Sequence, residues 1–215
     1  MERAVRTFLA VQGVPTIPCN EFSGRNDNHQ QAPTTYLFNE KSGRVERLVL
    51  PDLIRFPSFH AVEIKCQGYS PFMRRKIQTT GFLRRHYEHY LNYERQTQRT
   101  VELLFVHLVE DKVKGGTLDQ IEPCRTPLAN PIVNNETIYY EFNLLPEWPV
   151  SLSELLAVAL KFGKTLGREG YSADDHKAVV EYRETVAKPN HEKHLVEWGP
   201  RVIQRVPPPQ TEIPF

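Results

Sequence analysis

The sequence predicts a mixed α/β domain in which helices flank a central β-sheet. Short segments rich in β-branched and aromatic residues alternate with segments whose apolar residues recur at helical spacing. A continuous apolar segment at residues 101–111 follows a predicted helix, as expected for a strand buried on both faces and reached through a parallel crossover. Hydrophobic residues make up 40% and charged residues 25% of the 215-residue chain, which is ordinary for a globular protein.

The chain opens with an amphipathic helix. Residues 2–12 place apolar side chains on one face, and Gly13 ends the pattern. Glu2 lies in the first turn of this helix. Residues 14–22 are expected to form a strand, and the polar residues 23–34 a loop rich in turn formers.

Three short segments then predict an antiparallel meander, because each is rich in β-branched and aromatic residues. A polar KSGR turn separates the first two segments, and Pro57-Ser58 separates the second and third. The three segments are residues 34–40, 44–56 and 59–67.

The second half of the chain alternates helices with strands. A helix is predicted over residues 81–99, and residues 137–146 are expected to form a strand that follows the one at 101–111. Ser151 and Glu154 have the spacing of a capping box, which predicts a further helix over residues 151–163.

The C-terminal part is expected to be helical and then extended. Residues 176–188 predict a fourth helix, and three consecutive prolines near the end of the chain cannot continue a helix or a central strand. We therefore expect an α/β core at residues 1–150 and a helical, proline-rich extension at residues 151–215 that packs on the core.

Charge and cysteine content indicate an intracellular, cytoplasmic protein with no membrane partner. Lys plus Arg is 27 and Asp plus Glu is 26, so any basic surface must be local. The N-terminal segment carries charges among its apolar residues, unlike a secretory signal, and no segment has the length of a transmembrane helix. The three cysteines, Cys19, Cys66 and Cys124, are widely spaced and fit a reduced compartment.

Three charged residues, Asp52, Glu63 and Lys65, stand in segments that otherwise resemble buried strands. Isolated charges in a core are strongly unfavourable unless they are paired or bind a metal. If the chain turns at Pro57-Ser58, antiparallel pairing places Asp52 and Glu63 opposite each other, with Cβ atoms roughly 5 Å apart. Alternation along the strand then places Lys65 on the same face as Glu63.

Two facing carboxylates repel each other, and a divalent cation bound through oxygen ligands would remove the repulsion. Mg²⁺, or Mn²⁺ in its place, is the expected ion. A lysine beside such an ion can orient or help to deprotonate an attacking water and can offset charge on a phosphate. This combination is suited to hydrolysis of a phosphodiester.

An acid, any residue and a lysine also occur at residues 110–112 and 175–177, so the tripeptide at 63–65 is not specific in itself. It differs from the other two because it follows a Pro-Asp pair, lies in an apolar strand and faces a second acid across the predicted hairpin. One alternative is that Asp52 is an edge-strand acid and the charges at 63–65 pair across a solvent-facing sheet. Another is that the fold is present without the chemistry.

Pro51-Asp52, ten intervening residues and Glu63-Ile64-Lys65 resemble the motif of the PD-(D/E)xK nuclease superfamily. The resemblance extends from the first helix through the strand that begins near residue 101. It implies a restriction-endonuclease-like core with the order helix, three-strand meander, helix, strand, strand, followed here by a helical C-terminal extension.

The resemblance also implies roles for individual residues. The implied metal ligands are Asp52, Glu63, the carbonyl of Ile64 and, as an acid on the first helix, Glu2. The implied catalytic residues are Asp52, Glu63, Lys65 and Gln67, the last because it lies on the same strand face. Some exonuclease-like branches carry a glutamine shortly before a tyrosine on the next helix, but Arg and His precede Tyr87 and Tyr90 here, which leaves the branch open.

Positive charge is concentrated directly after this motif, in residues 74–99. Such a cluster is typical of a surface that grips a nucleic-acid backbone, although a solvated helix surface is the alternative. Tyr87 and Tyr90 share the apolar face with Leu83 and are expected in the core, with stacking on bases as the alternative. The predicted phosphate contacts are Arg74, Arg75, Lys76, Arg84 and Arg85.

The sequence therefore predicts a metal-dependent deoxyribonuclease with DNA as its partner, and RNA is left open as a substrate. A homodimer or a larger DNA-processing complex is compatible with this function. The alternative is a nucleic-acid-binding or assembly subunit on the same fold that does not cleave.

Overall fold

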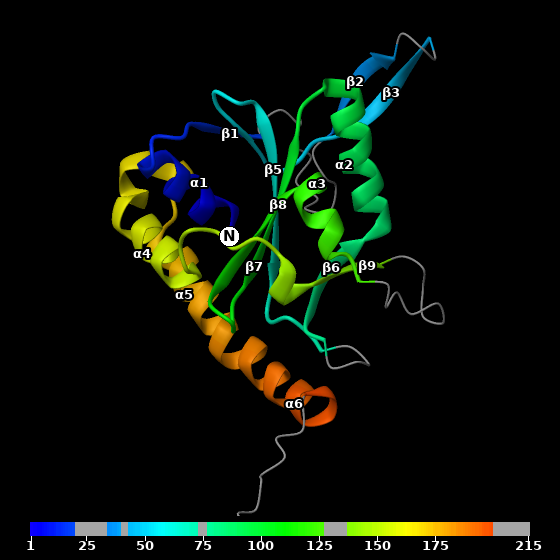
Figure 1. The fold of residues 1–215 in the computed structure, drawn as a ribbon. Helices are drawn as coiled ribbons and strands as arrows, with labels where there is room; N and C mark the ends of the chain where they lie inside the picture. Colours follow the sequence, from blue (N-terminus) through cyan, green and yellow to red (C-terminus); the bar gives the residue numbers. More distant parts are fainter. Residues whose placement is uncertain (20–33, 40–42, 73–76, 127–136, 200–215) are drawn as a thin grey trace, which may run out of the picture.

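The computed structural model has a central mixed β-sheet with helices on both faces (Figure 1). It describes residues 1–19, 34–39, 43–72, 77–126 and 137–199. Within these ranges no helix is long and apolar enough to cross a membrane. The predicted fold class, a mixed sheet flanked by helices, is confirmed at this level.

The central sheet has five strands in the order β1-β4-β5-β7-β8. Neighbouring strands are antiparallel except for β5 and β7, which are parallel as the sequence predicted. The strands are β1 (Thr16–Pro18), β4 (Leu53–Arg55), β5 (His60–Gln67), β7 (Val101–His107) and β8 (Lys112–Thr117).

One face of the sheet is covered by α1 (Glu2–Val11) and α4 (Leu152–Phe162), which pack against each other (Figure 1). The predicted capping box is present, since the Ser151 hydroxyl accepts from the Glu154 amide while the Glu154 carboxylate accepts from the Ser151 amide. The core on this face is aliphatic and aromatic, and includes Val5, Val62 and Leu155.

The other face is covered by α2 (Arg84–Thr97), by α3 (Leu118–Ile121) and by a small antiparallel sheet. That sheet pairs β6 (Thr79–Leu83) with β9 (Thr137–Glu141). Helix α2 forms the crossover from β5 to β7 that makes these two strands parallel. The core on this face is rich in aromatic side chains, and Phe82, Phe105 and Tyr140 lie within contact distance of one another.

The C-terminal helical segment consists of α5 (Ala173–Tyr182), a π-helical turn (Arg183–Ala187) and α6 (Lys188–Trp198), and α6 extends away from the sheet in Figure 1. It is longer than the predicted helix at 176–188. Short 3₁₀ turns occupy Glu122–Cys124, Phe142–Leu144 and Gly163–Glu169. The proline-rich tail lies outside the described residues, and the division at residue 150 stays a prediction.

The predicted meander is wrong in its first member. Residues 34–39 do not join the central sheet, because β2 (Thr34–Asn39) pairs only with β3 (Arg44–Val49) within the described part of the chain, as a separate hairpin. The antiparallel neighbours in the central sheet are instead β1, β4 and β5. The predicted strand at 44–56 is interrupted between Val49 and Leu53, where Pro51 lacks the N–H that a continuous ladder needs.

Two element boundaries and one additional strand also differ from the prediction. Helix α2 begins at Arg84 rather than 81, because Gly81, Phe82 and Leu83 belong to β6. The strand predicted at 137–146 ends at Glu141 and pairs with β6 rather than with the central sheet. Strand β8 was not predicted, because its sequence KVKGGT contains two glycines, one of which has a φ of +148° that other residues rarely adopt.

Candidate active site

Asp52 and Glu63 face each other at the open end of the β4–β5 hairpin. The register pairs Leu53 with Val62 and Arg55 with His60, so one further step places Asp52 opposite Glu63, as predicted from the turn. The Asp52 Oδ2 atom accepts a hydrogen bond from the Ile64 amide at 2.8 Å. The carboxylate of Asp52 is therefore fixed against the backbone of β5.

The carbonyl of Ile64 lies on the same edge of β5 as its amide, because the N–H and C=O of one residue in a strand point to the same side. The register places Pro51 opposite Ile64. Since proline has no N–H, Pro51 cannot donate the ladder hydrogen bond that the Ile64 carbonyl would otherwise accept. At the Pro-Asp pair, the Asp52 side chain therefore accepts the hydrogen bond from the Ile64 amide. The Ile64 carbonyl receives no ladder hydrogen bond from Pro51, so it is suited to bind another partner.

Glu63 is buried and accepts two side-chain hydrogen bonds. It is only 9% exposed, and its Oε1 atom accepts from Lys65 Nζ at 2.5 Å and from the Tyr90 hydroxyl at 2.8 Å. Lys65 Nζ also lies 5.6 Å from the centre of the Tyr90 ring. These contacts fix the Glu63 carboxylate between its own strand and α2.

Two residues on α2 complete this arrangement, and neither was among the predicted site residues. Tyr90 was expected only as a core residue, and it is indeed 4% exposed, but its hydroxyl reaches Glu63. His86 lies one turn earlier, with Nδ1 3.4 Å from Lys65 Nζ. Their i, i+4 spacing puts both on one helix face, which is the sequence signal that could have linked them.

Burial and, next in size, the charge of Glu63 raise the pKa of the Asp52 carboxyl to about 7. The hydrogen bond from the Ile64 amide and the charge of Lys65 act in the opposite direction. Burial also raises the pKa of the Cys19 thiol to about 12, with the charges of Asp52 and Glu2 adding to the effect. The site is therefore a buried, acidic position in which negative charge is not fully compensated.

Glu2, the acid that the family resemblance implied on the first helix, acts on this region through its charge, and its role as a metal ligand stays a prediction. It lies in the first turn of α1, and its charge raises the pKa values of both Asp52 and Cys19. Cys19 is itself fully buried, and its amide donates to the Asp52 carbonyl at 2.9 Å. The N-terminal helix thus contributes acidic charge to the site.

Gln67 lies on the same strand as the site but is bound elsewhere. Its Nε2 donates to the Gly81 carbonyl at 2.8 Å, and its Oε1 accepts from the Thr80 hydroxyl at 3.1 Å. Gln67 therefore ties β5 to β6, and its predicted place among the catalytic residues stays a prediction.

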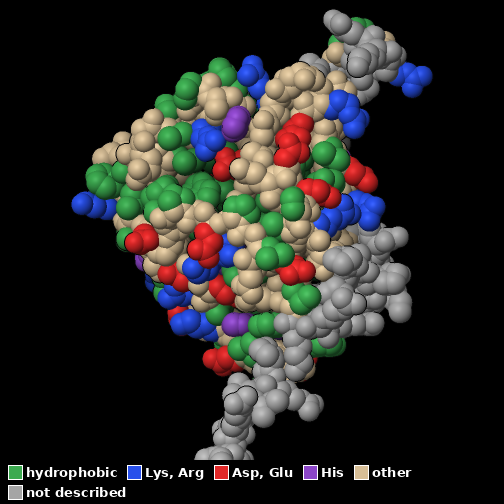
Figure 2. Space-filling view, in the orientation of Figure 1, with side chains coloured by type: hydrophobic (Ala, Val, Ile, Leu, Met, Phe, Trp, Pro, Cys, Tyr) green, Lys and Arg blue, Asp and Glu red, His purple; other side chains and the backbone are tan. Residues whose placement is uncertain are grey.

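The predicted phosphate contacts are only partly described. Arg84 and Arg85 are exposed in the first turn of α2, whereas Arg74, Arg75 and Lys76 lie outside the described residues. Burial and the charge of Lys65 lower the pKa of the neighbouring His86. On the face shown in Figure 2, acidic and basic side chains are interspersed.

The donors at the site fit a hard cation such as Mg²⁺. In the described ranges no group of three or more His, Cys, Asp or Glu side chains is placed to hold a metal. Mg²⁺ commonly uses only one or two protein carboxylates and keeps several waters. Asp52 and Glu63 supply that number, and burial together with the charge of Glu63 raises the pKa of Asp52, so a cation at this position would offset the repulsion.

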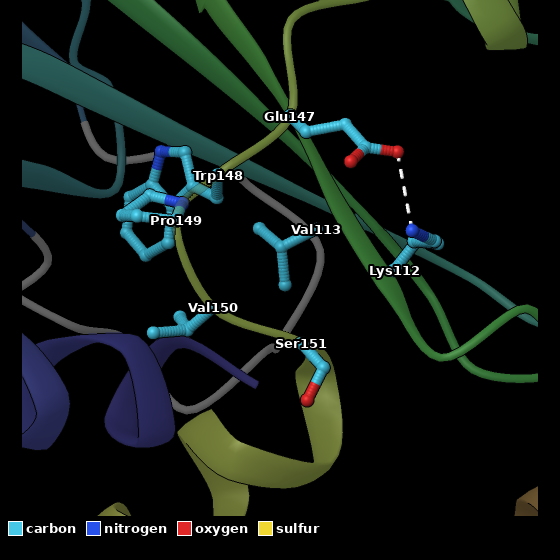
Figure 3. A pocket seen from close by; sticks show the side chains of 7 residues that line it. All are labelled: Lys112, Val113, Glu147, Trp148, Pro149, Val150 and Ser151. Carbon is cyan, nitrogen blue, oxygen red and sulfur yellow. Dashed lines mark hydrogen bonds and ion pairs between the residues drawn. The ribbon is translucent and has the colours of Figure 1, made fainter.

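A pocket of about 210 Å³ lies at a different place, between β8 and residues 147–151 (Figure 3). Its wall includes Trp148, and Glu147 at its edge is paired with Lys112 at 3.1 Å. None of the predicted site residues lines this pocket.

Comparison with known proteins leaves the family of the chain open. No family model matches it, and no curated protein matches it. Among solved structures, the fold is similar to that of Hjc, a Holliday junction resolvase from the archaeon Archaeoglobus fulgidus, with 11% sequence identity and a TM-score of 0.39. The match covers 68% of this chain and 92% of that one, and we draw no functional conclusion from it.

Proposed function

We propose that this protein is a metal-dependent nuclease that hydrolyses phosphodiester bonds in DNA. The observation that carries the proposal is the facing pair of half-buried Asp52 and buried Glu63 at the end of a hairpin, with Lys65 beside them. Two carboxylates that face each other destabilise the fold unless they bind a cation between them. The arrangement is therefore better explained by a role in metal binding than by a contribution to stability.

The proposed metal ligands are Asp52, Glu63 and the carbonyl of Ile64, with Glu2 adding negative charge. Bound there, Mg²⁺ or Mn²⁺ would act as a Lewis acid toward the phosphate and lower the pKa of a coordinated water. The Ile64 amide orients Asp52, and the Tyr90 hydroxyl orients Glu63. Lys65 is the group that would position the attacking water and offset charge on the phosphate.

The first test is cleavage of linear, circular and single-stranded DNA with Mg²⁺ or Mn²⁺, and with EDTA. We expect Lys65→Ala and Asp52→Asn to lower the cleavage rate at least ~100-fold while DNA binding persists. Lys112→Ala is a matched control, because Lys112 is the lysine of another acid-x-Lys tripeptide and is exposed. Equal cleavage by native protein and Lys65→Ala would contradict the proposed role of Lys65.

One observation favours the second candidate, a nucleic-acid-binding or assembly protein that does not cleave. Glu63 is already compensated by Lys65 and Tyr90, so part of its charge is balanced within the chain. Thermal unfolding with and without Mg²⁺ separates the two candidates. A nuclease site should be stabilised by the ion, because the ion binds the folded state, whereas a binding protein with an internally balanced site should not respond.

A further inference from the structure

The tip of the β4–β5 hairpin carries an aromatic residue in an unfavourable backbone conformation. Phe59 has a φ of +57°, in the left-handed region that glycine and asparagine tolerate and bulky residues rarely adopt. The Phe59 side chain is also 42% exposed, so burial of its ring alone does not explain why a phenylalanine occupies this position. Strained positions of this kind are concentrated at functional sites, where the side chain serves a purpose other than folding.

The surroundings of Phe59 combine an aromatic surface with positive charge. The Arg99 guanidinium lies 4.8 Å from the centre of the Phe59 ring, and Phe56 meets that ring edge-on at 4.6 Å between centroids. The Arg55 guanidinium forms an ion pair with Glu102 at 3.2 Å and lies 3.1 Å from His60 Nδ1. Arg99, in contrast, is exposed. The tip therefore presents a ring and a guanidinium together at the surface.

This tip belongs to the same hairpin as the candidate active site. Phe59 stands just before β5, and Glu63 lies further along that strand. At ~3.3 Å per residue the two positions are about 13 Å apart. This distance corresponds to roughly three or four nucleotides of one DNA strand at ~3.4 Å per nucleotide.

We propose that Phe59, together with Arg99, stacks on an unpaired nucleobase of the DNA held at the candidate active site. This inference rests on the proposed function. An aromatic ring and a guanidinium both bind the π-face of a base, with little dependence on which base it is. In a continuous duplex both faces of each base are already stacked, so this contact selects DNA with ends, gaps or junctions that expose a base.

The experiment measures binding by fluorescence anisotropy in EDTA, so that the DNA is not cut. The ligands are a duplex with a single-stranded overhang and a fully paired, closed duplex of the same length. Phe59→Gly removes the ring and suits the observed φ, so the hairpin is retained. Phe59→Trp keeps an aromatic ring, and Phe38→Ala is a matched control, because it removes another exposed phenyl group, on β2.

We expect Phe59→Gly to weaken binding of the overhang DNA about tenfold or more and to leave binding of the closed duplex within about twofold. Phe59→Trp and Phe38→Ala should bind both ligands like the native protein. A 2-aminopurine base in the overhang should be quenched by the native protein, most strongly about three or four nucleotides from the cleaved bond, and not by Phe59→Gly.

Two results would overturn the inference: equal binding of the overhang DNA by native protein and Phe59→Gly, or an equal loss for both ligands. If the native protein cleaves DNA with Mg²⁺ while Phe59→Gly behaves like it, the stacking inference fails and the proposed function stands. If the native protein neither binds nor cleaves any DNA, the proposed function fails and the inference fails with it.

Discussion

The face of the central sheet under α1 and α4 is filled mainly by aliphatic and aromatic side chains, whereas the face under α2 also buries the charged side chain of Glu63. On the first face Val62, Leu104 and Leu155 belong to one apolar cluster. On the second face Glu63 and Lys65 lie against Tyr90. The same strand, β5, supplies Val62 to one face and Glu63 to the other, since its side chains alternate.

The comparison shows that the residues that stabilise the fold and the residues of the candidate site can lie on opposite faces of one sheet. Aliphatic packing on the α1–α4 face stabilises the fold by removing apolar surface from water. The α2 face tolerates desolvated charges because an ion pair and a hydrogen bond compensate Glu63. Variants on the first face should therefore change stability, and variants on the second should change the site.

The largest stability effect is expected on the α1–α4 face. Leu155 is fully buried, and Leu155→Ala should lower the free energy of unfolding by about 2 to 5 kcal/mol, because it leaves a cavity. Urea unfolding measures the change. Val196→Ala is the control, because Val196 is 89% exposed and its loss should change stability by less than about 0.5 kcal/mol. A similar change in both variants would show that this face is not the stabilising one.

A pH-dependent effect is expected from Asp52, on the other face. Its pKa is about 7 in the folded protein against 3.8 for an aspartate exposed to solvent, so between these pH values the folded state binds a proton that the unfolded state has lost. Stability from this group should therefore fall by about 2 to 4 kcal/mol as pH rises from about 4 to 7. Urea unfolding at several pH values measures it.

The Asp52→Asn variant isolates this contribution. His107 contributes with the opposite sign, because burial lowers its pKa to about 3, so its contribution is lost as pH falls below about 6.5. His107 is unchanged in Asp52→Asn, so the difference between native and variant stability reports on Asp52. A difference that does not vary with pH would contradict the uncompensated charge at the site.

A smaller effect is expected from the hydrogen bond between helix and strand. Tyr90→Phe removes the hydroxyl that holds Glu63, and should lower stability by about 1.5 to 3 kcal/mol and reduce cleavage as well. Tyr87→Phe is the matched control on the same helix, because its hydroxyl bonds to Glu122 in a more exposed position. Tyr87→Phe should lower stability by less than about 1 kcal/mol and leave cleavage unchanged. Equal cleavage by the two variants would contradict a role for the Tyr90 hydroxyl in cleavage.

The smallest effect is expected at the start of α2. Arg84 lies in the first turn, where a positive charge opposes the helix dipole, and the N-cap residue Leu83 has no side-chain acceptor. Arg84→Gln should raise stability by about 0.3 to 1 kcal/mol while weakening DNA binding. Arg95→Gln, in the last turn, should lower stability instead. A loss of stability in Arg84→Gln would argue for a structural rather than a binding role.

Local features of the structure followed from the sequence because they depend on neighbouring residues. The turn at Pro57-Ser58 set the hairpin register that places Asp52 opposite Glu63. The capping box at Ser151 set the start of α4, and the apolar segment after α2 identified β7 as a buried parallel strand. In each case a short-range rule was sufficient.

Features that depend on distant partners did not follow. Residues 34–39 have the composition of a sheet strand, yet they pair in a separate hairpin, because composition does not specify the partner. Strand β8 resembles a turn in sequence and becomes a strand by pairing with β7. The contact between Tyr90 and Glu63 joins residues 27 positions apart and depends on how α2 lies on the sheet.

The sequence by itself determined the charged residues of the site and their order along one hairpin, because alternation and turn position are properties of the local chain. Only the tertiary structure decided that β1 rather than residues 34–39 lies beside β4, and that α2 brings Tyr90 and His86 to Glu63 and Lys65. The physical reason is that docking a helix on a sheet is governed by the combined packing of many side chains from distant parts of the chain, which no local pattern encodes.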